Sequence, residues 1–300
     1  MGNLALLGIS LLTGLLLQRV RAFPADAHRG LNAFIIYISL PAITLRYLPE
    51  LEPSWTWLYP AGMSWVVFLV GVGVFVSLGR WLGWDRQTVG CLVLVCGLGN
   101  TSFVGFPLIE AMYGTEGLRI AILCDQPGAF LVLSTLGIVA VGYFAAGRIT
   151  GRAILGRVLA FPPFLAFLAS LLLAPLSPWP DWITGPLETL GRTLTPLALV
   201  SVGLQLRLPR RDFPFPAFGI GLVYKLLLAP ALIWGLYVGL LRQEGLAIEV
   251  SILEAAMAPM ITPSIIAMEH GLNPPLASVL VGLGIPLSLL SVWGWYVGGL

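Results

Sequence analysis

The stretch GNTSFVGFPLIEAMYG, residues 99–114, places an Asn-Thr-Ser run, glycines and Pro107 inside a sequence that is otherwise apolar. If this stretch crosses a membrane, its helix is broken, and the freed backbone N–H and C=O groups must be covered by protein or line a water-filled site. A second interrupted stretch, AAMAPMITPSIIAMEHG at residues 255–271, contains Pro259 and Pro263. Two broken helices at matching places in the two halves of a chain predict the substrate site of a secondary transporter.

The composition is that of a membrane protein with many spans. Of the 300 residues, 58% are apolar and 10% charged, and the mean hydropathy is +0.93. A soluble fold with a polar surface cannot carry this balance. With about 20 residues to a span, the sequence predicts an all-α polytopic protein without a soluble domain. The ten predicted spans are 2–18, 31–48, 57–79, 88–113, 118–146, 157–176, 186–206, 214–241, 246–268 and 275–299.

The arginines predict the orientation of these spans. Eleven of the sixteen Lys and Arg residues lie in or beside the first, third, fifth and seventh connections between spans. These are Arg19, Arg21, Arg29, Arg80, Arg86, Arg148, Arg152, Arg157, Arg207, Arg210 and Arg211. Because positive loops stay in the cytoplasm, we expect a multi-pass protein of the cell inner (plasma) membrane whose N- and C-termini lie outside the cytoplasm.

The chain repeats itself weakly with a period of about 155 residues. Ser-Leu-Pro at residues 39–41 has a counterpart in Leu-Thr-Pro at residues 194–196, and further pairs follow in the same order. Each half, residues 1–150 and residues 151–300, would hold five spans. A repeat with an odd number of spans inserts its second copy upside down, which predicts an inverted repeat within one integral membrane unit.

Several of these motifs resemble those of the auxin efflux carrier family, which includes the plant PIN-type carriers. They are the 99–114 stretch, the acidic run IAILCD at residues 120–125, LEAAMAP at residues 253–259, and the tail at residues 273–295. The resemblance implies a fold shared with the bile acid:sodium symporters. In that fold spans 1, 2, 6 and 7 form a scaffold, spans 3–5 and 8–10 form a moving core, and the broken spans 4 and 9 cross.

A crossing of two broken helices can bind an anion without a cage of cations. The N-terminal ends of half-helices carry partial positive charge, while the carbonyl ends suit a small cation. The alternative is that the polar residues and prolines merely bend packed helices. The predicted substrate-binding residues are Asn100, Thr101, Ser102, Pro107, Met257, Pro259, Met260, Thr262, Pro263 and Ser264.

Ionisable residues inside spans are the second signal. A charge at the bilayer centre costs about 2.5 to 3.5 kcal/mol even on mild scales, so we expect Asp125, Glu254 and Lys225 to face one another or a wet cavity. With Asn100, the two carboxylates could hold Na⁺ through oxygen ligands, or could bind and release a proton. The resemblance to sodium symporters favours Na⁺. Alternatively Lys225 neutralises the carboxylates in place of an ion, or it snorkels to the cytoplasmic surface.

These features predict a secondary transporter of small organic anions, such as auxin-like or dicarboxylic acids, that works by an elevator-type movement coupled to Na⁺ or H⁺. The alternatives are an ion-independent uniporter or exporter and a membrane ligand sensor. The sequence has no HExxH motif or G-x-S-x-G nucleophile element, so we expect no enzyme. Apart from Na⁺ no cofactor is expected. The expected partners are the organic acid, membrane lipid and a second copy bound through the scaffold spans, and no nucleic acid.

Overall fold

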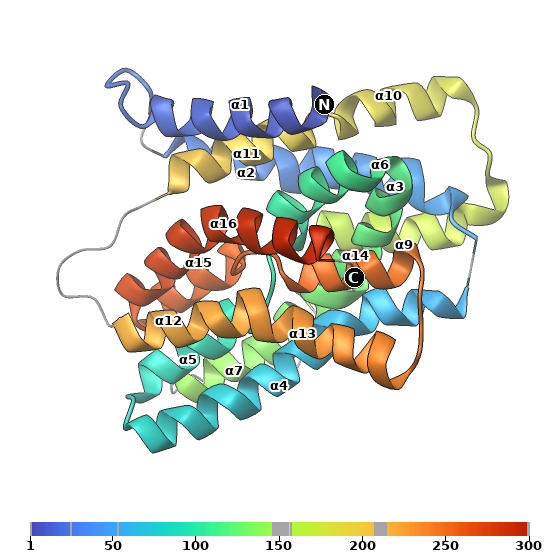
Figure 1. The fold of residues 1–300 in the computed structure, drawn as a ribbon. Helices are drawn as coiled ribbons and strands as arrows, with labels where there is room; N and C mark the ends of the chain where they lie inside the picture. Colours follow the sequence, from blue (N-terminus) through green and yellow to red (C-terminus); the bar gives the residue numbers. More distant parts are fainter. Residues whose placement is uncertain are drawn as a thin grey trace.

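The chain folds into a bundle of helices in the computed structural model (Figure 1). The structure describes residues 2–24, 26–52, 54–145, 156, 158–206 and 215–298. These ranges contain α-helices, π-helical turns and short 3₁₀ turns but no β-strand, which confirms the predicted all-α class.

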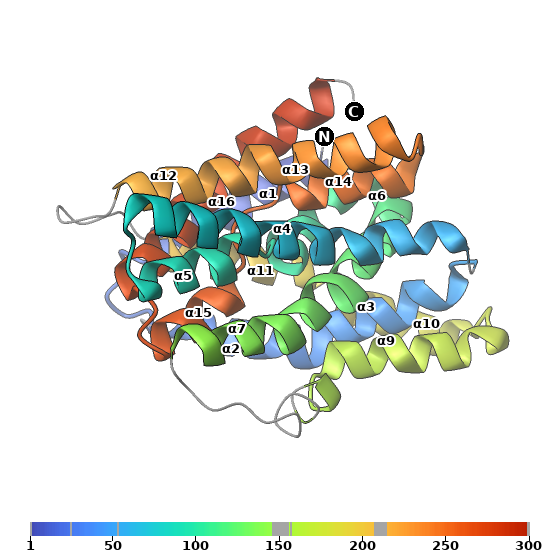
Figure 2. The same ribbon diagram turned by 90° about the horizontal axis from the view of Figure 1, so that it is seen from below.

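The helices pack as two groups, as Figures 1 and 2 show. We call the first the flanking group. It contains α1 (Gly2–Leu17), α2 (Ala27–Phe34), α3 (Leu40–Tyr47), α9 (Pro162–Leu173), α10 (Asp181–Gly191) and α11 (Leu194–Gln205). The second, the crossing group, contains α4 (Leu58–Leu82), α5 (Arg86–Cys96), α6 (Phe106–Leu123), α7 (Ile138–Phe144), α12 (Phe215–Val223), α13 (Ala229–Trp234), α14 (Leu246–Ala255), α15 (Ile261–Glu269) and α16 (Pro274–Val297). The main body of the flanking group lies along the upper side of Figure 1.

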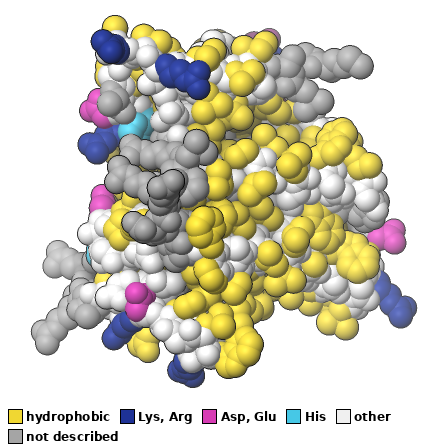
Figure 3. Space-filling view, turned by 60° about the vertical axis from the view of Figure 1, so that its left-hand side comes forward, with side chains coloured by type: hydrophobic (Ala, Val, Ile, Leu, Met, Phe, Trp, Pro, Cys, Tyr) yellow, Lys and Arg dark blue, Asp and Glu magenta, His cyan; other side chains and the backbone are white. Residues whose placement is uncertain are grey.

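The outer surface of the bundle is apolar. Figure 3 shows one face that is largely covered by hydrophobic side chains, with charged side chains toward its margins. Trp55 and Trp81, at the two ends of α4, are 87% and 81% exposed. The 25 residues of α4 extend about 37 Å at 1.5 Å per residue, enough to cross a hydrocarbon layer of about 30 Å. Tryptophans at both ends of such a helix are typical of the two membrane interfaces.

Five helical segments are long and apolar enough to cross a membrane. They are Ala27–Glu50, Trp55–Leu82, Thr101–Phe144, Phe215–Leu240 and Pro274–Val297. The segment Thr101–Phe144 turns sharply at Gly114, whose φ of 66° and ψ of −156° interrupt α6. Shorter apolar helices cover Leu6–Leu17, Arg86–Cys96 and Pro162–Leu176. The chain thus has the helices of a multi-pass membrane protein over the part that the structure describes.

The connections between helices alternate between the two ends of the bundle. In Figure 1 the connections from α1 to α2 and from α4 to α5 lie at the left, whereas those from α3 to α4, α9 to α10 and α13 to α14 lie at the right. The left end therefore carries Arg19, Arg29 and Arg80, and we call it the Arg19 end; the right end carries Glu50, and we call it the Glu50 end. Arg21 and Arg86 belong to the same two connections at the left end, whereas the other predicted cytoplasmic arginines Arg148, Arg152, Arg157, Arg207, Arg210 and Arg211 lie outside the described residues.

Widened π-helical turns precede several prolines within the long helices. The turns η1 (Ile35–Ser39), η4 (Thr101–Gly105) and η8 (Tyr224–Leu228) each end two residues before a proline, which is Pro41, Pro107 or Pro230. Another, η5 (Cys124–Phe130), contains Pro127, while η6 (Leu133–Gly137) and η9 (Gly235–Leu240) are π-helical as well. A proline lacks an N–H group and its ring collides with the carbonyl four residues earlier. A wider turn moves that carbonyl away, so the helices continue through their prolines. Short 3₁₀ turns η2 (Leu48–Glu50), η3 (Trp55–Trp57) and η7 (Ala174–Leu176) lie at helix ends.

Candidate functional site

The first broken helix is interrupted before Pro107. Helix α5 ends at Cys96, and the chain resumes helical structure only at η4, which begins at Thr101 and leads into α6. Asn100 caps this second half, because its side-chain oxygen accepts a hydrogen bond of 3.2 Å from the backbone N–H of Phe103. Such a cap satisfies one of the N–H groups that every helix start leaves free.

The second broken helix is interrupted at Pro259. Helix α14 ends at Ala255, and α15 begins at Ile261. Pro259 lies in the extended stretch between them, whereas Pro263 lies in the first turn of α15. The first turn of a helix tolerates proline, since the missing N–H would have no partner there.

The two breaks cross and bind each other through their backbones. Gly99 lies opposite Pro259 in an antiparallel bridge. The N–H of Asn100 donates to the carbonyl of Ala258 at 2.8 Å, and the N–H of Met260 donates to the carbonyl of Leu98 at 3.2 Å. Backbone groups that the breaks free from helical pairing are thus satisfied within the protein, as a low-dielectric surrounding requires. The predicted crossing of the broken helices is present.

Two glycines of the first break allow the second half of the chain to approach. A Cβ atom on Gly99 would lie 3.0 Å from Nζ of Lys225, and one on Gly105 would lie 2.3 Å from Oε2 of Glu254. Neither glycine has a positive φ that would demand glycine for the backbone itself. Their role is therefore to leave room for a buried ammonium and a buried carboxylate.

Asp125 is buried beside the crossing and is held by two side chains. The hydroxyl of Thr101 donates to Oδ1 at 2.5 Å, and Nε2 of Gln126 donates to Oδ2 at 2.9 Å. Asp125 is 2% exposed and Gln126 is fully buried. Both carboxylate oxygens of Asp125 thus have hydrogen-bond donors, while the side-chain oxygen of Gln126 has no partner among the described residues.

Glu254 and Lys225 are both buried at the crossing, but among the described residues only the side chain of Lys225 has a hydrogen-bond partner. Both carboxylate oxygens of Glu254 are buried without a hydrogen-bond partner in the described part of the chain. Lys225 is 1% exposed, and its ammonium donates at 2.6 Å to the carbonyl of Ala255, the last residue of α14. An ammonium at a helix C-terminus is favoured by the negative end of the helix dipole. Lys225 therefore does not snorkel, and that alternative is wrong.

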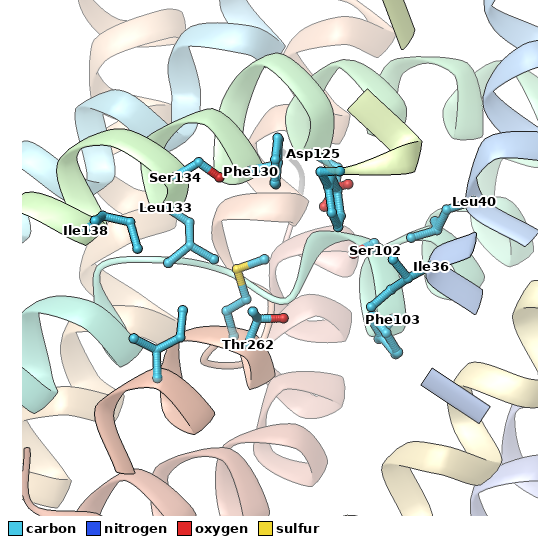
Figure 4. A pocket seen from close by; sticks show the side chains of 13 residues that line it. Ile36, Leu40, Ser102, Phe103, Asp125, Phe130, Leu133, Ser134, Ile138 and Thr262 are labelled. Carbon is cyan, nitrogen blue, oxygen red and sulfur yellow. The ribbon is translucent and has the colours of Figure 1, made fainter. Parts of the chain in front are cut away.

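A cavity of about 210 Å³ opens beside the crossing, between the two helix groups (Figure 4). In Figure 4 Asp125 and Ser102 lie on one side, near Ile36 and Leu40 of the flanking group. Most of the wall is apolar, and no Lys or Arg is among the described residues that form it. The lining residues are Ile36, Leu40, Ser102, Phe103, Asp125, Phe130, Leu133, Ser134, Ile138, Phe161, Met260, Thr262 and Ile266.

The sequence profile of the membrane transport protein family matches this chain over residues 1–148 and 148–296. The chain belongs to this family. It is 28% identical over 275 residues to an uncharacterised transporter of Methanocaldococcus jannaschii, an alignment that covers 88% of each chain. It is 25% identical to a putative malonate transporter of Rhizobium meliloti over 94% of this chain and 90% of the relative. A probable auxin efflux carrier component of Oryza sativa is 26% identical over 108 residues, 31% of this chain and 27% of the relative. The family and the names of these relatives indicate a membrane transporter rather than an enzyme.

The transporter brings only part of the predicted substrate-binding set to the cavity. Ser102, Met260 and Thr262 line it, together with Asp125, which was predicted for ion coupling. The remaining predicted residues lie outside this wall. Asn100, Thr101, Met257 and Pro259 are buried within the crossing, Pro263 is buried in α15, Pro107 lines a hollow at the Glu50 end, and Ser264 lines one near His28.

The sequence reasoning missed most of the apolar wall of the transporter's cavity. Phe130 stacks on Phe161 with ring centroids 3.9 Å apart, although these residues belong to different helix groups. Aromatic and aliphatic residues are common in every span, so nothing in the sequence distinguishes those that line a cavity. Gln126 was also missed, although an amide next to Asp125 in an apolar stretch was a signal that could have found it.

Proposed function

We propose that this membrane transporter carries small organic anions by alternating access, in an elevator-type movement of the crossing group against the flanking group. The single observation that carries the proposal is the placement of the cavity. It lies beside the crossing, and its wall is shared by both groups. A relative movement of the groups would carry a molecule bound there from one side of the membrane to the other, while the packed crossing moves as a unit.

An anionic substrate is supported by the ends of two half-helices. Ser102 lies in the first turn after Asn100, Thr262 lies in the first turn of α15, and both side chains line the cavity. Helix N-termini offer free N–H groups and partial positive charge, which together attract a carboxylate. The apolar remainder of the wall suits the hydrocarbon part of such an acid.

The names of the relatives supply two candidate classes of substrate. One relative is named for malonate, a short dicarboxylate, and another as an auxin efflux carrier component. We therefore propose carboxylates that are either auxin-like or dicarboxylic as the substrates of this chain.

Coupling to Na⁺ or H⁺ is supported by the carboxylate of Glu254. A buried carboxylate without a hydrogen-bond partner is costly unless a cation or a proton neutralises it. Asn100, Asp125 and Glu254 would hold the cation, and the free side-chain oxygen of Gln126 offers a further neutral ligand. A Na⁺ ion bound there would supply positive charge next to the substrate carboxylate.

The alternative is an ion-independent carrier in which Lys225 replaces the ion. Lys225 is fully buried at the crossing, which supports this alternative. No ion pair within 4.0 Å joins Lys225 to Asp125 or Glu254 among the described side chains, and its hydrogen bond goes to a backbone carbonyl. These contacts favour a coupled carrier.

We further propose ten spans in two inverted halves, 1–150 and 151–300, with the termini outside the cytoplasm. In this arrangement α1, α2 with α3, α9 and α10 with α11 are spans 1, 2, 6 and 7, the scaffold. Supporting observations are the apolar helices, the alternation of connections between the two ends of the bundle, and the arginines at the Arg19 end.

Uptake into proteoliposomes tests the proposal. The purified transporter, reconstituted with a Na⁺ or pH gradient, should accumulate labelled malonate or an aromatic monocarboxylate, and collapsing the gradient should stop accumulation. Glu254→Gln should abolish the effect of the gradient. Accumulation that proceeds equally without either gradient would favour the ion-independent carrier, and absence of carboxylate transport after a broad screen would contradict the proposal.

A further inference from the structure

A chain of alternating charges crosses from one helix group to the other at the Glu50 end. Its members, in the order in which they contact, are Glu116, Arg119, Glu50, Arg46, Glu188 and Arg192. The first two belong to α6 of the crossing group; on the flanking side Arg46 belongs to α3, Glu50 to η2 and Glu188 to α10, and Arg192 directly follows α10. Within this chain of charges, the contact between Arg119 and Glu50 is the one that joins the groups.

Both partners of the joining ion pair are held in place by neighbours of their own group. Nη2 of Arg119 donates to Oε2 of Glu50, while Nη1 of Arg119 donates to Glu116 at 2.9 Å. The other oxygen of Glu50 accepts from Arg46 at 2.5 Å. The side chains of Arg119 and Glu50 are 16% and 30% exposed. Pre-oriented, half-buried charges lose less conformational freedom on pairing than free surface side chains do.

A second polar contact joins the groups at the same end. The hydroxyl of Thr195 on α11 donates at 3.2 Å to the carboxylate of Glu110 on α6. Both residues line a hollow of about 430 Å³ between the groups, where Glu188 and Arg192 lie as well. At the Glu50 end the two groups are thus connected by charged and polar side chains.

The substrate cavity extends in the other direction. Its wall follows the chain from Asp125 at the crossing through Ser134 to Ile138, the first residue of α7, and follows α15 from Thr262 to Ile266. Both α7 and α15 continue toward the Arg19 end, because Arg86 at the start of α5 donates to the carbonyl of Tyr143 in α7, and Asn273, which follows α15, donates to Thr88 in α5. The cavity therefore reaches from the crossing toward the Arg19 end, away from the ion pair.

We propose that the ion pair between Arg119 and Glu50 is a latch that holds the crossing group in the position in which the cavity faces the Arg19 end. The proposal rests on the movement of the two groups proposed above. Movement that turns the cavity toward the Glu50 end separates Arg119 from Glu50, so the pair sets the balance between the two positions. A partly exposed pair shifts an equilibrium by a small factor only, which keeps both positions accessible.

The latch is tested by measuring from which side the cavity can be reached. In the full-length chain, Ser134→Cys places a reporter thiol in the cavity wall, and the native Cys91, Cys96 and Cys124 are buried. A charged, membrane-impermeant methanethiosulfonate is applied from either side, in cells and in inside-out vesicles. Arg119→Gln and Glu50→Gln should each raise the labelling rate from the Glu50 side by about two- to fivefold and lower it from the Arg19 side.

A matched control comes from the same chain of charges. Arg192 is 74% exposed at the Glu50 end, and its partner Glu188 lies in the same helix group. Arg192→Gln removes one positive charge from this end and leaves the ion pair between Arg119 and Glu50 in place, so its labelling should equal that of the parent. If Arg119→Gln and Glu50→Gln label like the parent, or if Arg192→Gln changes labelling as much as they do, the latch is overturned.

A covalent bridge separates failure of the latch from failure of the proposed movement. Glu50→Cys and Arg119→Cys are combined with the reporter Ser134→Cys, and the reporter thiol is first protected reversibly. A bifunctional thiol reagent then bridges the two new cysteines, and the reporter is deprotected. This bridge should abolish labelling of the reporter from the Glu50 side. If bridging abolishes it but the single charge variants behave like the parent, the groups move and the latch alone is wrong. If bridging leaves labelling from both sides unchanged, the groups do not move at this contact, and both proposals are overturned.

Discussion

Replacing Gly105 with alanine should disturb the carboxylate of Glu254 and little else. The backbone of Gly105 is helical, with φ −62° and ψ −56°, so alanine fits the chain itself. Its Cβ, however, would lie 2.3 Å from Oε2 of Glu254, whereas ordinary contact begins near 3.4 Å. The carboxylate must therefore retreat by about 1 Å, in a region where side chains are closely packed.

The size of the effect follows from two opposing terms. Overpacking a buried position costs about 1–3 kcal/mol, and alanine in a helix gains about 0.5–1 kcal/mol over glycine. We expect the free energy of unfolding to fall by about 1–2 kcal/mol. Because the displaced carboxylate is the proposed ligand for the coupling ion, the thermal stabilisation by Na⁺ or by protons should also disappear.

Thermal unfolding of the purified protein in detergent, with Na⁺ or K⁺ in the buffer, measures both quantities. Gly73→Ala is the matched control, since Gly73 lies in α4 with no atom within 4 Å of its would-be Cβ. This change should be neutral or stabilising by about 0.5–1 kcal/mol. The double variant Gly105→Ala with Glu254→Ala removes the collision and should regain stability without regaining the ion response. A Gly105→Ala protein that is as stable as the control and keeps the parent's ion response would refute the reasoning.

Three other outcomes are expected. Lys225→Met removes the side-chain donor to the carbonyl of Ala255 and should lower the free energy of unfolding by about 1–3 kcal/mol; unchanged thermal unfolding would mean that this carbonyl has another partner. Carboxylate binding, measured by thermal shift, should depend on Na⁺ or on pH in the parent but not in Asp125→Asn or Glu254→Gln, because each change removes one of the carboxylates proposed to hold the cation; equal affinity of the parent in Na⁺ and K⁺ at acid and neutral pH would contradict cation coupling. Protease-accessible tags at either terminus should be cleaved from outside intact cells, and a protected C-terminal tag would mean that the span count is wrong by one.

The two breaks were predictable because the sequence violates the rules of a membrane helix there, whereas their crossing was expected only from the family resemblance. Polar residues and proline are unfavourable in the middle of an unbroken apolar span, yet the chain has Asn100, Thr101 and Pro259 there. The structure places all three at the two breaks. The position of the first break was less clear from sequence. Pro107 is its most visible signal, yet the helix continues through this proline because the widened turn η4 precedes it. The chain leaves helical structure earlier, before Asn100.

The cavity was not predictable in the same way. Its wall combines Ile36, Phe130 and Phe161 from three distant parts of the chain, and each is an ordinary apolar residue in an apolar span. Only packing between the helix groups selects them. The contacts of Lys225 could not be predicted from sequence either, since a buried lysine can snorkel, form an ion pair or bind a carbonyl. Which of these it does depends on where α14 ends. The sequence indicates which residues are unusual, whereas the fold decides which of them meet.

The three ionisable side chains buried at the crossing have an electrical consequence. Lys225, Asp125 and Glu254 are all at most 2% exposed, and when ionised they sum to one negative charge. A bound Na⁺ or proton makes this sum zero, and a carboxylate substrate adds its own negative charge. Moving one charge through the full field changes the energy by about 2.3 kcal/mol for each 100 mV of membrane potential. If the crossing group moves, the voltage across the membrane therefore acts on it differently when it is empty, ion-bound or loaded with substrate.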